Sequence, residues 1–178
     1  MSRTNRIILI CVETTKDAKT DSIYIDKTLK YVYNVDNETK IEYEYLTSKT
    51  KYNDRGVKRR IERKIKDFSK AIIVYCLDSD DIFANPETAA LNRTVEDFCK
   101  REGYKIVWFC RDVEEVFLHR RVGSTDKLSE AAKFNAQKGI GVATAKLLGR
   151  TNIVKEKTSN FTCVFDKLFV KKAIKIIH

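Results

Sequence analysis

Three continuous apolar runs constrain the fold of this 178-residue chain more than any other feature. They fall within residues 6–12 (RIILICV), 71–77 (AIIVYCL) and 105–110 (KIVWFC), and they are rich in β-branched and aromatic side chains. Short runs without alternating polar positions are typical of strands buried on both faces, as in a parallel sheet. The runs therefore predict a parallel sheet that is covered by helices on both sides.

Helical patterns separate these strands along the chain. Apolar residues recur at helical spacing within residues 21–33, 56–68 and 86–103, and a short helix is expected over 112–121. A further strand, residues 40–46, alternates isoleucine and tyrosine with glutamate, which is typical of a half-buried strand near a sheet edge. The order predicts an α/β fold, with a mostly parallel central sheet and helices on both faces.

The pattern weakens after Val122, where helical material follows. We expect residues 1–122 to form the α/β domain and residues 123–178 to form a C-terminal helical extension packed on the same domain. Within the extension, residues 161–177 are expected to form a short strand followed by a helix. No linker rich in glycine, serine or proline divides the chain.

Composition excludes several classes of protein. Hydrophobic residues make up 43% of the chain, which is too much for a disordered protein, and 6 glycines and 1 proline are too few for a collagen-like one. No apolar run approaches the ~20 residues that span a bilayer, and the start lacks the plan of a signal peptide. Five cysteines without a C-x-x-C pair, beside only two histidines, argue against a zinc ribbon. We therefore expect a cytoplasmic protein with reduced cysteines and no membrane partner.

Charge indicates the class of partner. The chain holds 35 lysines and arginines against 25 acidic residues, a formal net charge of +10. Nucleic acid, DNA or RNA, is the usual partner of such a basic domain.

Acidic residues follow all three buried strands. The first strand ends at Glu13, the second continues into Asp78 and Asp80, and the third leads through Asp112 to Glu114 and Glu115. Ligands of open α/β sheets bind beyond the carboxyl ends of the strands, so these side chains are expected at one edge. Carboxylates held close together repel each other unless a cation offsets them, and Mg²⁺ prefers such oxygens. The alternative is that they are loop residues, helix caps (Asp112 above all) and solvated helix residues (Glu114 and Glu115).

An apolar strand ending in glutamate, followed further along by one ending in Asp-x-Asp, resembles the Toprim domain of topoisomerases, primases and small nucleases. The segment 112–119 (DVEEVFLH) also resembles the glutamate-centred helix of RloB-like and OLD-type Toprim proteins of bacterial defence systems. The resemblance covers roughly residues 5–120 and implies a Toprim/Rossmann-like fold. It also implies Glu13 as general acid/base, with Asp78 and Asp80 as ligands of Mg²⁺. Glu13 and Glu115 are expected as further metal ligands.

Two basic segments are expected to bind the phosphates of a substrate. The first is the outward face of the helix over 57–66, and the second follows the glutamate-bearing helix. The residues in question are Arg59, Arg60, Arg63, Lys64, Arg120 and Arg121. The alternative is an ordinary solvated helix surface. Residues 138–149 (KGIGVATAKLLG) resemble the hairpin of helix-hairpin-helix DNA-binding modules. The favoured alternative is a plain helix that ends at Gly149.

These features together predict a Mg²⁺-dependent nuclease that hydrolyses phosphodiester bonds, with a role in phage defence implied by the resemblance. The main alternative is a non-catalytic module of the same fold that binds nucleic acid or a protein partner. Thr14, which stands where most Toprim proteins have glycine after the glutamate, favours that alternative. A receiver-like signalling domain is the third and weakest hypothesis. No G-x-x-x-x-G-K-[ST] loop is present, so any ATPase would be a separate partner chain, and the oligomeric state is left open.

Overall fold

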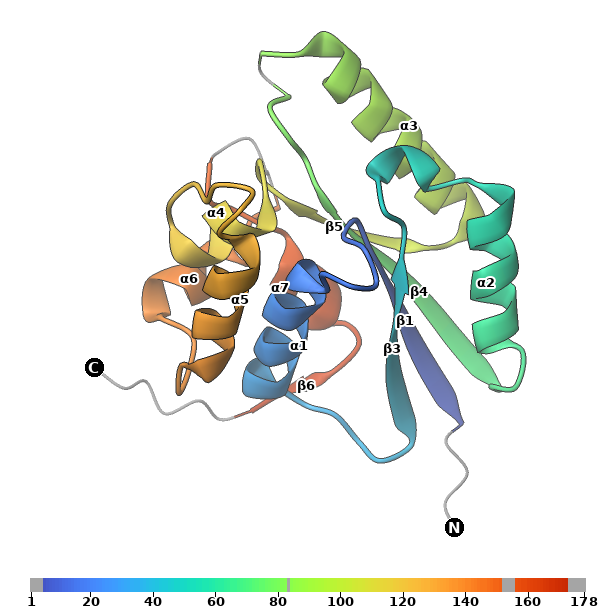
Figure 1. Cartoon of the computed structure of the whole chain (residues 1–178). Coiled ribbons are helices and arrows are strands. Elements are labelled where there is room, and N and C mark those ends of the chain that lie inside the picture. The colour runs from blue at the N-terminus through green and yellow to red at the C-terminus, as the bar shows by residue number, and fades with distance from the viewer. Residues whose placement is uncertain (1–4, 83, 152–155, 173–178) are drawn as a thin grey trace.

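A computed structural model describes residues 5–82, 84–151 and 156–172 of the chain (Figure 1). Its centre is a four-stranded sheet in the order β3-β1-β4-β5, with all neighbours parallel. The strands are β1 (Arg6–Val12), β3 (Thr39–Tyr45), β4 (Lys70–Asp78) and β5 (Lys105–Phe109). The predicted α/β class is confirmed, and the alternating segment, now β3, does lie at an edge.

Helices cover both faces of this sheet (Figure 1). Successive residues of the central strand β1 point to opposite sides, so Leu9 and Cys11 join one apolar cluster while Ile8 and Ile10 join the other. The first cluster includes residues of α2 (Arg55–Ile65) and α3 (Pro86–Glu102). The second includes residues of α1 (Thr20–Val32) and α4 (Val113–Leu118). Both faces of β1 are fully buried, which explains its unbroken apolar sequence.

Helix ends follow signals that are visible in the sequence. The side chain of Asn85 accepts hydrogen bonds from the backbone of the first turn of α3, and Pro86 opens that helix. Gly103 ends it at φ +72°, a left-handed conformation that glycine adopts without strain. Asp112 caps α4 by accepting from the Glu115 N–H at 2.7 Å. The helix expected over residues 86–103 is therefore confirmed, as is the interpretation of Asp112 as a helix cap.

The C-terminal part packs on the α1 side of the sheet. It contains α5 (Lys127–Ala136), α6 (Val142–Leu147), α7 (Phe161–Phe165) and the two-residue β6 (Val170–Lys171). Buried residues from this part, among them Phe134 and Leu148, belong to the same apolar cluster as Ile8 and Ile10 of β1. Residues 127–169 thus complete the core on that face.

The order expected within residues 161–177 was wrong. A short helix comes first, because Phe161 and Phe165 lie one helical turn apart and bury both rings side by side at a centroid distance of 4.5 Å. The strand follows it, with β6 pairing antiparallel to β2 (Tyr33–Asn34). Residues 173–177 lie outside the described part of the chain.

None of the helices within residues 5–82, 84–151 and 156–172 is long and apolar enough to cross a bilayer. All five cysteines are free thiols, and Cys11, Cys76 and Cys110 are buried small residues, as the apolar runs predict.

Candidate functional site

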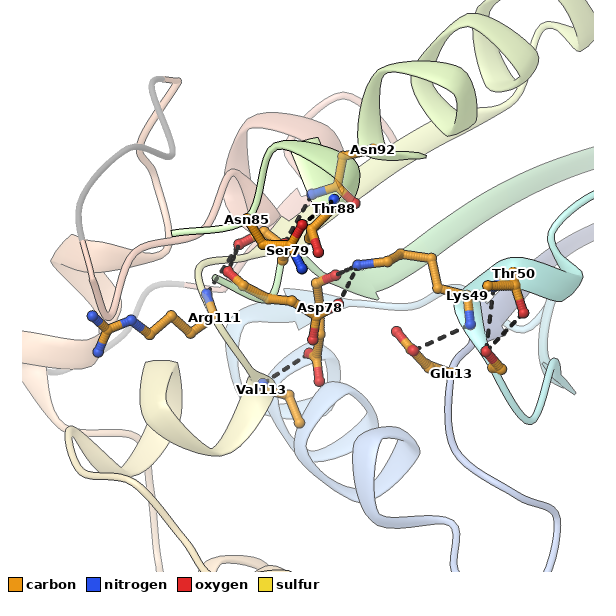
Figure 2. Close-up of polar contacts among 12 residues, drawn as sticks. Glu13, Lys49, Thr50, Asp78, Ser79, Asn85, Thr88, Asn92, Arg111 and Val113 are labelled. Atoms are coloured by element: carbon orange, nitrogen blue, oxygen red, sulfur yellow. Dashed lines mark hydrogen bonds and ion pairs between the residues drawn. The ribbon is translucent and has the colours of Figure 1, made fainter. Parts of the chain in front are cut away.

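The carboxyl edge of the sheet brings Glu13, Asp78 and Asp80 together around a lysine, Lys49. Figure 2 shows Lys49 beside Glu13 and Asp78. Glu13 follows β1, Asp78 ends β4, and Lys49 opens a short 3₁₀ helix, η1 (Lys49–Lys51), after the edge strand β3. The Lys49 backbone N–H donates to Glu13 Oε1 at 3.1 Å. Its ammonium donates to the Asp78 carbonyl oxygen at 2.7 Å and to Asp80 Oδ2 at 2.5 Å. A single lysine therefore contacts all three residues that the sequence analysis proposed as catalytic.

The tight turn after β4 holds Asp80 in place. Asp80 has a left-handed backbone (φ +53°), and its N–H donates to the Arg111 carbonyl oxygen at 2.9 Å. The next strand end is tied to the same turn, since the Arg111 N–H donates to Ser79 Oγ at 3.0 Å. These cross-links join the ends of β4 and β5, so both strands deliver their polar residues to one place.

The carboxylates of Asp78 and Asp80 have different partners, because β4 ends at Asp78 and the left-handed backbone of Asp80 breaks the strand geometry. Asp78 Oδ1 accepts from the Val113 N–H at 2.9 Å, at the start of α4. Burial raises the pKa of Asp78 well above its ordinary value, and the charges of Asp21, Glu13 and Glu114 raise it further. Asp78 is thus the centre of a wider group of carboxylates.

Asp21 and Glu114 complete this acidic group. The sequence analysis did not identify Asp21, and for Glu114 it left open a solvated position on a helix. Asp21 lies in the first turn of α1, is only 8% exposed, and has its pKa raised to about 6 by burial first and by Glu114 second. Glu114 is fully buried rather than solvated. Its Oε2 accepts from Lys127 Nζ at 2.9 Å, while its Oε1 has no hydrogen-bond partner. Asp21 gave no sequence signal, because it falls within an ordinary amphipathic helix pattern.

Lys127 supplies the positive charge beside Glu114. Burial lowers the pKa of this lysine, but the hydrogen bond and the charge of Glu114 outweigh that effect, so the net shift is upward. Lys127 begins α5, and a segment outside the expected α/β domain therefore contributes to the site.

Glu115 lies in a different environment from Glu114. It is buried, but its oxygens lie 3.5 Å from Arg111 Nη1 and 3.9 Å from Arg121 Nε. Neighbouring residues on a helix point about 100° apart, so only one of the two glutamates can face Asp78. The position near Asp78 that we expected for Glu115 belongs to Glu114.

Glu13 is a partly buried acid that accepts a hydrogen bond from the Lys49 backbone. Its pKa is raised by burial, an effect that the peptide N–H and the charge of Lys49 partly offset. Glu13 Oε2 is buried and has no hydrogen-bond partner. Buried carboxylate oxygens of this kind normally have a partner, so Glu13 and Glu114 each carry one oxygen that an added cation would satisfy.

The chemistry of this donor set fits Mg²⁺, which binds carboxylate oxygens and retains water. Within residues 5–82, 84–151 and 156–172, however, no three acidic, histidine or cysteine side chains are grouped closely enough to hold a metal ion as they stand. The cation that contacts Asp80 is the Lys49 ammonium. Glu13, Asp78 and Asp80 are the residues that the sequence analysis expects to hold Mg²⁺.

The basic residues predicted on α2 fall into two groups. Arg60 Nε and Lys64 Nζ lie 2.5 Å and 3.0 Å from the two oxygens of Glu44, a buried residue of β3. Arg59 and Arg63 are exposed. Two of the four predicted phosphate-binding residues are therefore engaged in balancing an internal charge.

The two residues of the second predicted basic segment, Arg120 and Arg121, also have different surroundings. Arg120 forms an ion pair with Glu130 of α5. The Arg121 side chain is 68% exposed, and its Nε lies 3.9 Å from Glu115 Oε2. Arg121 is the better placed of the two to meet an external phosphate.

The glycines of the 138–149 segment have an internal explanation. A Cβ on Gly139 would lie only 3.0–3.1 Å from the ring and hydroxyl of Tyr31, so this glycine lets α1 and the α5–α6 turn approach. Thr144 is buried, and its hydroxyl lies 2.8 Å from His119 Nε2. These contacts account for two of the residues that resemble a DNA-binding hairpin.

Comparisons of this chain with family models, with curated proteins and with solved structures find no significant match.

Proposed function

We propose that this chain is a Toprim-like, Mg²⁺-dependent nuclease that hydrolyses phosphodiester bonds of nucleic acid. One observation carries the proposal: Glu13, Asp78 and Asp80, which are far apart in sequence, all contact Lys49 at the carboxyl edge of a parallel sheet. That edge is where open α/β sheets bind ligands. The parallel order β3-β1-β4-β5 places the glutamate and the Asp-x-Asp pair on adjacent central strands.

Each of these residues has a distinct part in the proposed reaction. Asp78 and Asp80 would hold Mg²⁺, which when bound neutralises charge on the phosphate. Glu13, with one carboxylate oxygen unpartnered, is the group to exchange a proton with the attacking or leaving oxygen. Glu114 and Asp21 surround Asp78 and strengthen the negative potential that attracts the metal ion.

A polyanionic substrate agrees with the charge of the protein. The net charge of +10 favours nucleic acid, and exposed Arg59, Arg63 and Arg121 are the residues proposed to bind its phosphates. A role in defence against phage, in the cytoplasm and with a separate ATPase as partner, is part of the proposal through the resemblance to RloB-like and OLD-type proteins.

A cleavage assay on labelled single-stranded DNA, double-stranded DNA and RNA tests this function. We expect cleavage of at least one substrate with Mg²⁺ and none with EDTA. The double variant Asp78→Asn with Asp80→Asn should lose cleavage. Asp81→Asn, which changes an exposed acid of the same loop, is the matched control and should cut like the parent. Cleavage by the double variant at the parental rate would refute the assignment.

A non-catalytic nucleic-acid-binding module is the second candidate. The ion pair between Lys49 and Asp80 favours it, because it leaves Asp80 already neutralised. Binding that depends on salt but not on EDTA, without cleavage of any of the three substrates, would support this function instead.

A further inference from the structure

The two edges of the central sheet have different surroundings. At β5, the Trp108 N–H donates to Asn160 Oδ1 at 2.8 Å, and the Asn160 side-chain amide donates to the Ile106 carbonyl oxygen at 3.1 Å. The Cys110 N–H, just after the strand, donates to the Thr158 carbonyl oxygen at 2.9 Å. The outer side of β5 is therefore paired with a later segment of the same chain.

The opposite edge is β3, which Figure 1 shows as an outer strand between α1 and α2. The Arg6 N–H donates to the Glu38 carbonyl oxygen at 3.1 Å, and the Leu46 N–H donates to the Val12 carbonyl oxygen at 2.9 Å. Even-numbered residues of β3 thus bond to β1, and the odd-numbered residues direct their N–H and carbonyl groups outward.

Most of these outward groups have no partner. In the part of the chain that the structure describes, two bonds reach them: Lys64 Nζ donates to the Tyr43 carbonyl oxygen, and the Thr39 N–H donates to the Asp36 carbonyl oxygen at 3.3 Å. Both backbone groups of Ile41, the Tyr43 N–H and the Thr39 carbonyl oxygen remain unused. Such an open edge is a template for pairing with another strand.

The side chains of β3 are self-complementary about Ile41. In an antiparallel pair centred on Ile41, Lys40 of each copy lies opposite Glu42 of the other, and the two Ile41 side chains meet. Lys40 and Glu42 form an ion pair within their own strand, yet their side chains stay 49% and 30% exposed. They can therefore also meet the charges of a second copy.

Other registers lack this complementarity. A pair centred on residue 40 places lysine opposite lysine, and one centred on residue 42 places glutamate opposite glutamate. Like charges directly opposite each other destabilise an antiparallel pair, so charge selects the register centred on Ile41.

We propose that β3 pairs antiparallel with β3 of a second copy of this chain, in the register centred on Ile41. The Ile41 N–H donates to the Ile41 carbonyl oxygen of the other copy, and the Tyr43 N–H donates to its Thr39 carbonyl oxygen; symmetry repeats each bond. None of the existing hydrogen bonds of this edge has to break. Two four-stranded sheets become one, with their carboxyl edges pointing in opposite directions.

Charge reversal tests both the pairing and its register. Sedimentation velocity from about 5 to about 500 µM protein, in about 0.15 M salt to screen the repulsion between two basic chains, measures the dimer dissociation constant. Lys40→Glu creates two glutamate pairs and Glu42→Lys creates two lysine pairs, so each variant alone should dimerise at least about tenfold more weakly than the parent. An equimolar mixture of the two variants restores opposite charges at both positions and should dimerise like the parent.

Lys105→Glu is the matched control. It makes the same charge change at an exposed residue that begins β5, on the other edge of the sheet. Its dissociation constant should stay within about twofold of the parental value, because the changed charge lies outside the proposed interface.

Amide hydrogen exchange gives a second measurement that needs no variant. The N–H groups of Ile41 and Tyr43 are unbonded in the single chain, so their exchange should slow as the protein concentration rises. The Glu42 N–H faces β1 in either state, and its exchange should not depend on concentration.

Three results would overturn the pairing. The first is a parent that sediments as a monomer at the highest concentration. The second is a dimer that persists unchanged in Lys40→Glu and in Glu42→Lys. The third is a mixture of these two variants that associates no more strongly than either variant alone.

Discussion

Two buried glutamates on opposite faces of the sheet are compensated very differently. Glu44 of β3 has a cation on each carboxylate oxygen, Arg60 on one and Lys64 on the other. Glu114 of α4 is even more buried, yet it has Lys127 on one oxygen and no hydrogen-bond partner on the second. Both carboxylate oxygens of Glu44 thus form ion pairs that stabilise the fold. In the group around Glu114, Asp78 and Glu13, by contrast, two carboxylate oxygens accept no hydrogen bond.

The contrast shows how to recognise a site among buried acids. A structural acid is surrounded by positive charge, because burying an unpaired carboxylate costs several kcal/mol. A site that binds a cation keeps acids close to each other and leaves oxygens unpartnered, at the expense of stability. The predictions below test that distinction, from the largest effect to the smallest.

The largest difference is expected between Glu13→Gln and Glu44→Gln in the cleavage assay. Glu13→Gln should lower the rate by about 10²-fold or more, because it removes the group proposed to exchange a proton. Glu44→Gln should stay within about threefold of the parent, since the Glu44 carboxylate forms its ion pairs with Arg60 and Lys64 of α2. An equal loss in both variants would mean that the distinction between the two acids does not hold.

For the free energy of unfolding, we expect Glu44→Gln to be the more harmful of these two variants. Glu44→Gln leaves Arg60 and Lys64 without their carboxylate, and we expect it to lower the free energy of unfolding by about 1–2 kcal/mol. Urea denaturation in EDTA measures the effect. Arg59→Gln, on the same helix but exposed, is the control and should change stability by less than about 0.5 kcal/mol.

Asp21 should make the acidic group sensitive to pH. Its pKa rises from 3.8 to about 6 on folding, so the folded chain binds the proton more tightly than the unfolded chain. Its ionisation therefore costs stability as the pH rises from about 4 to about 6, and the cost persists above that range. Asp21→Asn removes it and should raise the free energy of unfolding by about 1–2 kcal/mol at pH 8.

Thermal melts of Asp21→Asn and the parent in EDTA, at pH 4 and pH 8, check this expectation. The advantage of the variant should be present at pH 8 and largely absent at pH 4, where the parental carboxyl is protonated in both states. A variant that is equally stabilised at both values would show that the effect does not come from ionisation.

The smallest effect concerns nucleic-acid binding by α2. The double variant Arg59→Gln with Arg63→Gln should weaken binding about fivefold and reduce its salt dependence, because it removes two phosphate contacts. Arg60→Gln with Lys64→Gln removes the same charge but from the Glu44 network, and its effect on affinity should be smaller. Filter binding at several salt concentrations compares the two, and equal losses would assign all four residues to one surface.

The amino-acid sequence alone determined most of the fold. The apolar runs predicted β1, β4 and β5 as buried parallel strands, and the alternation of residues 40–46 predicted an edge strand. The reason is that a strand buried on both faces is apolar throughout, whereas a strand buried on one face alternates apolar and polar residues. The end of the sheet at which Glu13, Asp78 and Asp80 meet also followed from chain order and strand direction. The position of Asp112 directly before a short helical segment was also enough to predict that it caps the helix.

Only the tertiary structure decided which charges act on each other. Glu114 rather than Glu115 raises the pKa of Asp78, Asp21 joins from α1, and Lys49 reaches the site from the edge strand. Such contacts depend on helix rotation and on loops that approach through space, and the periodicity of a sequence contains neither. The same holds for Glu44, which looked like a solvated residue of an alternating strand until α2 placed two cations against it.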